Sequence, residues 1–155
     1  MTTKSILVNF NGCPSSVDSL MPDNGLANLA GSLLAEGHET CIMDFNSVDI
    51  IRKMIPDNIS RELNVVYQDS IADVKTKPHS EKTLLDHLLK LDHELDDHKH
   101  LELLKIANEI AHKATIMGAD FIGFKLWTGE GFEGSVKIAT EIKKNLPDIK
   151  LFAGG

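Results

Sequence analysis

Three glycines with the spacing Gly-x-Gly-x-x-Gly, namely Gly129, Gly131 and Gly134, lie between an apolar run and a helical pattern. In dinucleotide-binding domains this spacing lets a pyrophosphate approach the backbone at the N-terminus of a helix. That use also needs an acidic residue at the end of the next strand, to hold the ribose. The chain instead has Phe-Ala-Gly-Gly there, at residues 152–155. A dinucleotide-binding domain of an oxidoreductase is therefore an alternative function, and not the leading one.

A second group of residues that could do chemistry is the acidic, histidine-rich run at residues 92–100. His93 with Asp97, and Glu94 with His98, are i, i+4 pairs that could share a metal ion on one face of a helix. The run lies between two leucine-patterned segments, however, and dense charge in that setting is typical of a solvated helix. We expect these side chains to be exposed and to hold no metal that folding requires.

No motif marks the chain as catalytic by itself. The sequence lacks a Gly-x-Ser-x-Gly elbow, a Walker loop and a His-Glu-x-x-His pair. A phospho-acceptor domain of similar fold would need paired acids after the first apolar run and an aspartate after the third. Asn9, Asn11 and Lys125 occupy those regions. An enzymatic activity of this chain alone is therefore not predicted.

Apolar runs and helical patterns alternate along the chain in the order typical of βαβ units. The runs expected to form strands are residues 5–10, 40–45, 121–126 and 149–153. A helix capped by Asn24 and ended by Gly37 joins the first two runs, and a helix over 133–145 joins the last two. Residues of about 60–118 carry leucines at helical spacing and are expected to form a helical insertion.

These elements predict one α/β domain over residues 1–155, with a flavodoxin-like (Rossmann-like), doubly wound parallel sheet in the order 2-1-3-4. A doubly wound sheet normally continues with another helix and strand, so the fold is expected to be incomplete at its C-terminus. In this topology a ligand binds beyond the carboxyl ends of the strands, where the winding reverses. Residues 11–25, 125–131 and the turn at Gly154 and Gly155 should line that crevice, with Asn24 and Thr128 as polar anchors.

Composition narrows the classes of partner. The chain has 155 residues and a formal net charge of −7, which disfavours binding to nucleic acid. No apolar run is long enough to cross a membrane, and no signal-peptide pattern precedes the first strand. Two cysteines are too few for a disulfide framework or a four-cysteine metal site. We expect a cytoplasmic protein whose ligand is a small molecule.

Three segments resemble the N-terminal cobalamin (vitamin B12)-binding domain of cobalamin-dependent radical S-adenosylmethionine enzymes. The first is Pro-Asp-Asn-Gly-Leu at residues 22–26, continuing to Glu-Gly-His at 36–38. The second is DFIGFKLWTGEGFEGSV at residues 120–136, which is similar to that family's third strand and ligand loop. The third is Leu-Phe-Ala-Gly-Gly at residues 151–155, similar to its fourth strand and double glycine. The helical insertion is not part of this resemblance.

The resemblance implies a base-off cobalamin, with the corrin across the strand ends and the dimethylbenzimidazole tail in the crevice beside the third and fourth strands. The cofactor-binding residues implied in this way are Asn24, Gly25, Lys125, Leu126, Trp127, Thr128, Gly129, Gly154 and Gly155. Many cobalamin domains carry Ser-x-Leu where this chain has Lys125, Leu126 and Trp127. The lysine would either line the slot with its stem and meet a phosphate, or partly fill the slot.

Other motifs of cobalamin enzymes are absent. No Asp-x-His-x-x-Gly follows the first strand, so the chain is expected to offer no histidine ligand to cobalt. No Cys-x-x-x-Cys-x-x-Cys is present, so an iron–sulfur cluster and S-adenosylmethionine would belong to a downstream radical domain, beyond this chain. The leading hypothesis is thus a cobalamin-binding module that is not catalytic alone. A cofactor-free interaction module of the same fold is a further alternative.

Overall fold

The computed structural model describes residues 2–13, 20, 22–73 and 81–155. The chain forms two compact units, one comprising Met1–Ile51 with Leu103–Gly155 and the other comprising Arg52–Glu102. The first unit holds all the described strands and is called the sheet unit below. The second is helical and is called the insertion unit.

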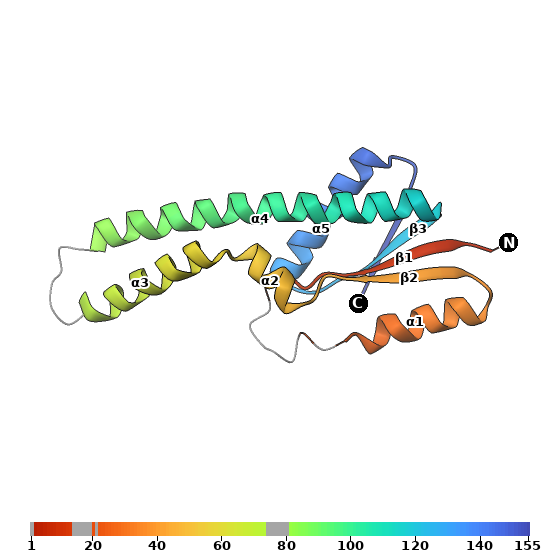
Figure 1. The fold of residues 1–155 in the computed structure, drawn as a ribbon, viewed down its shortest axis with the longest axis horizontal. Coiled ribbons are helices and arrows are strands. Elements are labelled where there is room, and N and C mark those ends of the chain that lie inside the picture. The colour runs from red at the N-terminus through yellow and green to blue at the C-terminus, as the bar shows by residue number, and fades with distance from the viewer. Residues whose placement is uncertain (1, 14–19, 21, 74–80) are drawn as a thin grey trace. The chain divides into compact units, whose positions relative to one another are not determined.

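Four parallel strands form the sheet, as Figure 1 shows. They are β1 (Lys4–Asn9), β2 (Glu39–Asp44), β3 (Phe121–Lys125) and β4 (Lys150–Gly154), in the spatial order β2-β1-β3-β4. Residues 5–9 of β1 are all buried, as expected for a central strand with neighbours on both sides. The predicted α/β, doubly wound parallel fold with the order 2-1-3-4 is confirmed.

Helices cover both faces of this sheet. On one face, Leu26 and Ala30 of α1 (Asn24–Ala35) form a buried cluster with Leu7 of β1. Successive strand residues face opposite ways, so Ile6 and Val8 are buried on the other face. That other face is covered by α5 (Glu130–Asn145) and by the end of α4 (Glu81–Met117), whose Met117 Sδ lies 4.0 Å from the Cys41 Sγ of β2.

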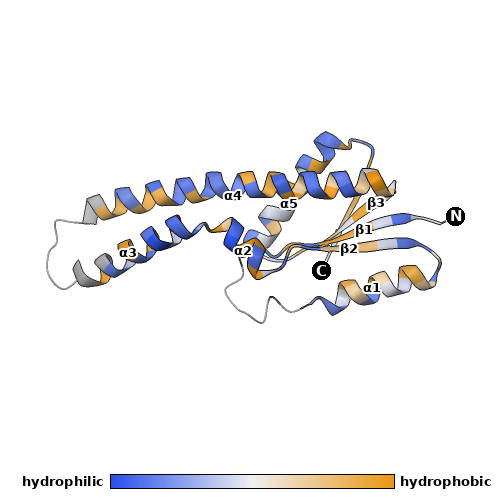
Figure 2. Cartoon of the chain, in the orientation of Figure 1, coloured by the Kyte–Doolittle hydropathy of each residue, from blue (hydrophilic) through white to orange (hydrophobic). Residues whose placement is uncertain are grey.

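The insertion unit is an antiparallel pair of helices, α3 (Asp57–Asp73) and the first part of α4, preceded by α2 (Val48–Met54). His87 of α4 lies 3.7 Å from Glu62 of α3, and His98 donates a hydrogen bond of 2.6 Å to the Lys53 carbonyl. Polar and apolar residues alternate along α4 (Figure 2), and no helix among the described residues has the length and apolar character to span a bilayer.

Several boundaries differ from the sequence-based prediction. The N-cap of α1 is Asp23, not Asn24, because the Asp23 carboxylate accepts a hydrogen bond of 2.8 Å from the Leu26 amide. Helix α2 was not predicted, α3 begins before residue 60, and α5 begins at Glu130 instead of residue 133. The strand boundaries move by one residue at most.

Candidate functional site

The register of the sheet places four polar or small residues in one row at the carboxyl ends of the strands. Asp44, Asn9, Lys125 and Gly154 are successive partners across β2, β1, β3 and β4. Leu7 is two residues before Asn9, so this row lies on the face that α1 covers. The next row inward on that face is apolar or small, and it consists of Ile42, Leu7, Gly123 and Phe152.

A groove of about 410 Å³ lies on this face, between α1 and strands β3 and β4. Helix α1 packs on β2 and β1, so the groove is open on its β4 side. Two of its apolar lining residues, Leu29 and Phe152, are 48% and 57% exposed. The residues that line the groove are Leu7, Asp23, Gly25, Leu26, Leu29, Phe121, Gly123, Phe124, Lys125, Phe152, Ala153, Gly154 and Gly155.

The floor of the groove has little side-chain volume. Among the described residues, a Cβ placed on Gly154 would meet no atom within 4 Å, and one placed on Gly123 would meet only Cδ2 of Leu7, at 3.2 Å. Phe121 and Phe152 lie at the inner end, with their rings edge-to-face and their centroids 5.5 Å apart. The result is an apolar slot with aromatic walls at one end, a shape that suits a planar group.

The outer end of the groove carries an ion pair between the Lys125 ammonium and the Asp23 carboxylate. The Asp23 side chain is only 8% exposed and that of Lys125 is 25% exposed. Asp23 uses one oxygen for the N-cap of α1 and the other for Lys125. The pair therefore connects the end of β3 to the start of α1 across the mouth of the groove.

Trp127 also contacts the ammonium group of Lys125. Nζ of Lys125 lies 4.0 Å from the centroid of the Trp127 ring, which is a cation–π distance. The indole Nε1 donates a hydrogen bond of 2.9 Å to Oδ1 of Asn9, and Nδ2 of Asn9 donates one of 3.0 Å to Oδ1 of Asp44. Asn9 is buried, so these hydrogen bonds fix the Trp127 ring at the carboxyl ends of the strands.

No protein-family model matches the chain, and comparisons with curated proteins and with solved structures give no match either. Functional inference for this chain therefore depends on its own residues and geometry.

The structure brings together part of the predicted cofactor-binding set. Gly25, Lys125, Gly154 and Gly155 line the groove, and Asn24 is the first residue of α1, between the groove-lining Asp23 and Gly25. Leu126, Trp127, Thr128 and Gly129 lie in the turn after β3 and do not line it, although Trp127 contacts Lys125. Of the predicted segment 11–25, residues 14–19 and 21 lie outside the described residues.

Several lining residues were not predicted as site residues. Phe121, Gly123 and Phe152 were expected to be strand residues, while Asp23 belongs to the segment 11–25 that was expected to line the crevice but was not singled out as a polar anchor. Alternation along β3 was the available signal, because Phe121, Gly123 and Lys125 are two residues apart and share one face. The ion pair between Asp23 and Lys125 had no sequence signal, since the two residues are 102 positions apart.

The glycine motif after β3 is explained by packing. Gly129 has φ 58°, which favours glycine, at the start of α5. A Cβ on Gly131 would lie 2.8 Å from Cβ of Trp127, and a Cβ on Gly134 would overlap the Phe10 ring. Protein atoms thus occupy the space that the second and third glycines leave. This arrangement gives the dinucleotide-binding alternative no support.

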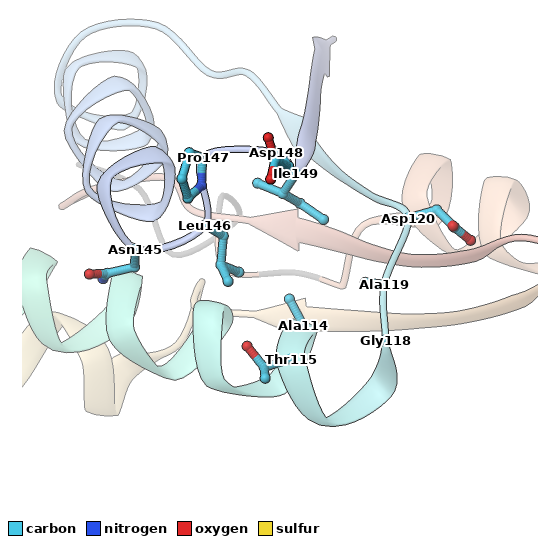
Figure 3. A pocket seen from close by; sticks show the side chains of 10 residues that line it. All are labelled: Ala114, Thr115, Gly118, Ala119, Asp120, Asn145, Leu146, Pro147, Asp148 and Ile149. Atoms are coloured by element: carbon cyan, nitrogen blue, oxygen red, sulfur yellow. The ribbon is translucent and has the colours of Figure 1, made fainter.

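A second pocket, of about 360 Å³, lies at the other ends of the strands, their amino ends (Figure 3). Its lining includes Ala114, Leu146 and Ile149, and the Asp120 carboxylate points away from its centre. Asp120 instead accepts a hydrogen bond of 2.8 Å from the Lys4 amide. This pocket lies at the amino ends of the strands, away from the edge where doubly wound folds bind ligands.

The histidine-rich run does not form a metal cluster. Among the residues that the structure describes, no group of three or more His, Cys, Asp or Glu side chains could hold an ion together. His93 lies 3.7 Å from Asp97, and both side chains are more than 70% exposed. The expected exposure is confirmed for His93 and His100, while His98 is partly buried against the Lys53 carbonyl.

Proposed function

We propose that the sheet unit binds cobalamin in its base-off form, with the dimethylbenzimidazole tail in the groove between α1 and strands β3 and β4. The observation that carries this proposal is the apolar slot over Gly123 and Gly154, at the carboxyl ends of parallel strands. Its lining of leucine and phenylalanine suits the faces of a bicyclic aromatic ring.

The dimensions of the groove fit such a tail. A cavity of about 150 Å³ accepts benzene, and small-molecule sites span about 300–1,000 Å³. The groove, at about 410 Å³, is therefore large enough for a fused bicyclic ring and part of its ribose. Leu26 and Leu29 would form the wall on the α1 side, and Phe121 and Phe152 would contact the inner end of the ring.

The remainder of the cofactor would lie outside the groove, against the strand ends, where Thr128 and Gly129 are exposed. The described parts of the loops that follow β1, β2 and β3 in the sheet unit contain no histidine, so no imidazole from these loops would replace the tail at cobalt. When bound, cobalamin supplies a cobalt centre for methyl transfer or radical rearrangement.

The chain would act as a module of a larger system. It has only two cysteines, Cys13 and Cys41, so the iron–sulfur cluster and S-adenosylmethionine would be held by a separate radical domain, in the cytoplasm. The chain's own contribution would be to bind the tail, keep it from cobalt and orient the corrin toward that domain.

Titration of the purified chain with hydroxocobalamin, and separately with NAD, tests this proposal. We expect a saturable change in the cobalamin absorption spectrum and a rise in melting temperature, because a ligand that binds only the folded state stabilises it. NAD should give neither effect. Binding of NAD without cobalamin would favour the dinucleotide-binding alternative. Binding of neither would overturn the proposal in favour of an interaction module that uses the open apolar side of the groove.

A further inference from the structure

We infer that Lys125 makes the groove selective for an aromatic ligand that carries a phosphate, with Asp23 and Trp127 as its positioning residues. The inference rests on the proposed function, because it assigns a role in recognising the nucleotide tail. It concerns a residue in which the chain departs from the Ser-x-Leu pattern of many cobalamin domains.

The position of the ammonium group follows from the sheet register. Lys125 is opposite Gly154 and two residues after Gly123, so its stem leaves the sheet beside the two small floor residues. Its Nζ contacts Asp23 at the start of α1, and both residues line the groove. A planar ring over Gly123 would thus have the ammonium group at its outer end, where the sugar and phosphate of a nucleotide continue toward solvent.

Two contacts with described residues hold the ammonium group, and together they use one of its N–H donors. An ammonium has three N–H donors, and the Asp23 carboxylate takes one of them. The Trp127 ring, 4.0 Å from Nζ, attracts the charge through its face. The Lys125 side chain is 25% exposed, and on this proposal a further N–H of the ammonium donates to an anionic oxygen that arrives from solvent. Such a charge-assisted hydrogen bond is about twice as strong as a neutral one.

The Asp23 carboxylate does not cancel this attraction. A phosphate oxygen in contact with Nζ would be farther from Asp23 than from Lys125, and Coulomb energy falls with distance. Both Asp23 oxygens already accept hydrogen bonds, one from the Leu26 amide and one from Lys125. The ammonium is therefore held in place before a ligand arrives, which lowers the entropy lost on binding.

The test compares two fragments of the cofactor tail that differ only by a phosphate group. α-Ribazole is the dimethylbenzimidazole nucleoside, and α-ribazole 3′-phosphate adds the phosphate. We expect isothermal titration to show that the wild-type chain binds the phosphate at least about 10-fold more tightly than the nucleoside, with this preference weakening as salt rises. Lys125→Met keeps the stem but removes the charge, so it should lose the preference for the phosphate, and the uncompensated Asp23 carboxylate should even disfavour the phosphate. Lys125→Arg should retain the preference.

Equal binding of the two compounds by the wild-type chain would overturn the inference while leaving the proposed function intact. An unchanged preference in Lys125→Met, with the melting temperature showing that the variant is folded, would also overturn it. Failure to bind either compound overturns it as well. A parallel titration with hydroxocobalamin then separates failure of this inference from failure of the proposed function. If cobalamin still binds, the proposed function stands. If cobalamin does not bind, the inference and the proposed function are both wrong.

Discussion

Replacing Gly154 with valine should block the groove without disturbing the fold. No atom of the described residues lies within 4 Å of the position that a Cβ would take, so the new side chain should not clash with the protein. The backbone at this position does not have a positive φ, so valine can adopt it. Glycine in a strand costs about 0.5–1 kcal/mol relative to alanine, so the free energy of unfolding should stay the same or rise slightly.

The expected loss of cobalamin affinity follows from the cost of overpacking. Forcing extra methyl groups into an occupied site costs about 1–3 kcal/mol. Each 1.4 kcal/mol is a factor of about ten, so Gly154→Val should weaken binding by about 5-fold to about 150-fold. Urea unfolding and a titration with hydroxocobalamin measure the two quantities on the same preparation.

Gly31→Ala provides a matched control. A Cβ at Gly31 also meets no atom of the described residues within 4 Å, but this residue is exposed on α1 and does not line the groove. The variant should be more stable by about 1 kcal/mol, because alanine favours a helix, and its cobalamin affinity should not change. Unchanged affinity in a folded Gly154→Val variant would mean that the ligand does not lie between α1 and β4.

Three further outcomes are expected. Gly134→Ala should lower the free energy of unfolding by about 1–3 kcal/mol in urea titrations, because its Cβ would overlap the Phe10 ring; full stability would refute this packing. Burial raises the pKa of the Cys41 thiol, with Lys113 opposing the rise and Glu39 adding to it. The thiol's contribution to stability is therefore present below its ordinary pKa and is lost as the pH rises through its pKa in the folded protein. The difference in unfolding free energy between wild type and Cys41→Ala should therefore shrink at alkaline pH, and a growing difference would contradict the stated direction. Treatment with a chelator should leave the melting temperature unchanged, because the described residues form no three-ligand cluster, whereas a clear drop would reveal a structural metal.

The strands could be predicted because buried parallel strands are continuous apolar runs. Residues 5–10 and 121–126 contain such runs, and the flavodoxin-like topology with right-handed crossovers then predicts the order that the sheet has. Helix α2 was missed because Val48–Met54 is too short for helical periodicity to stand out. Asp23 and Asn24 are equally good N-caps, so only the observed hydrogen bond to Leu26 distinguishes them.

The candidate site could be predicted at the level of loops and glycines, but its contacts could not. The rule that ligands bind at the carboxyl ends of the strands places Lys125 and Gly154 there, and both line the groove. Phe152 looked like an ordinary strand residue, and its role depends on which part of the sheet α1 leaves uncovered. Such packing is a property of the assembled fold, and no local pattern near residue 152 encodes it.

Electron paramagnetic resonance of cob(II)alamin mixed with the purified chain tests the central claim most directly. When the dimethylbenzimidazole nitrogen coordinates cobalt, it splits the cobalt lines into triplets, and free cobalamin at neutral pH shows this splitting. If the tail enters the groove between α1 and β4, and no histidine replaces it, the bound cofactor should lose the nitrogen splitting. Gly154→Val should restore it at the same concentrations. A wild-type spectrum identical to that of free cob(II)alamin, at concentrations where the chain is folded and in excess, would contradict the account.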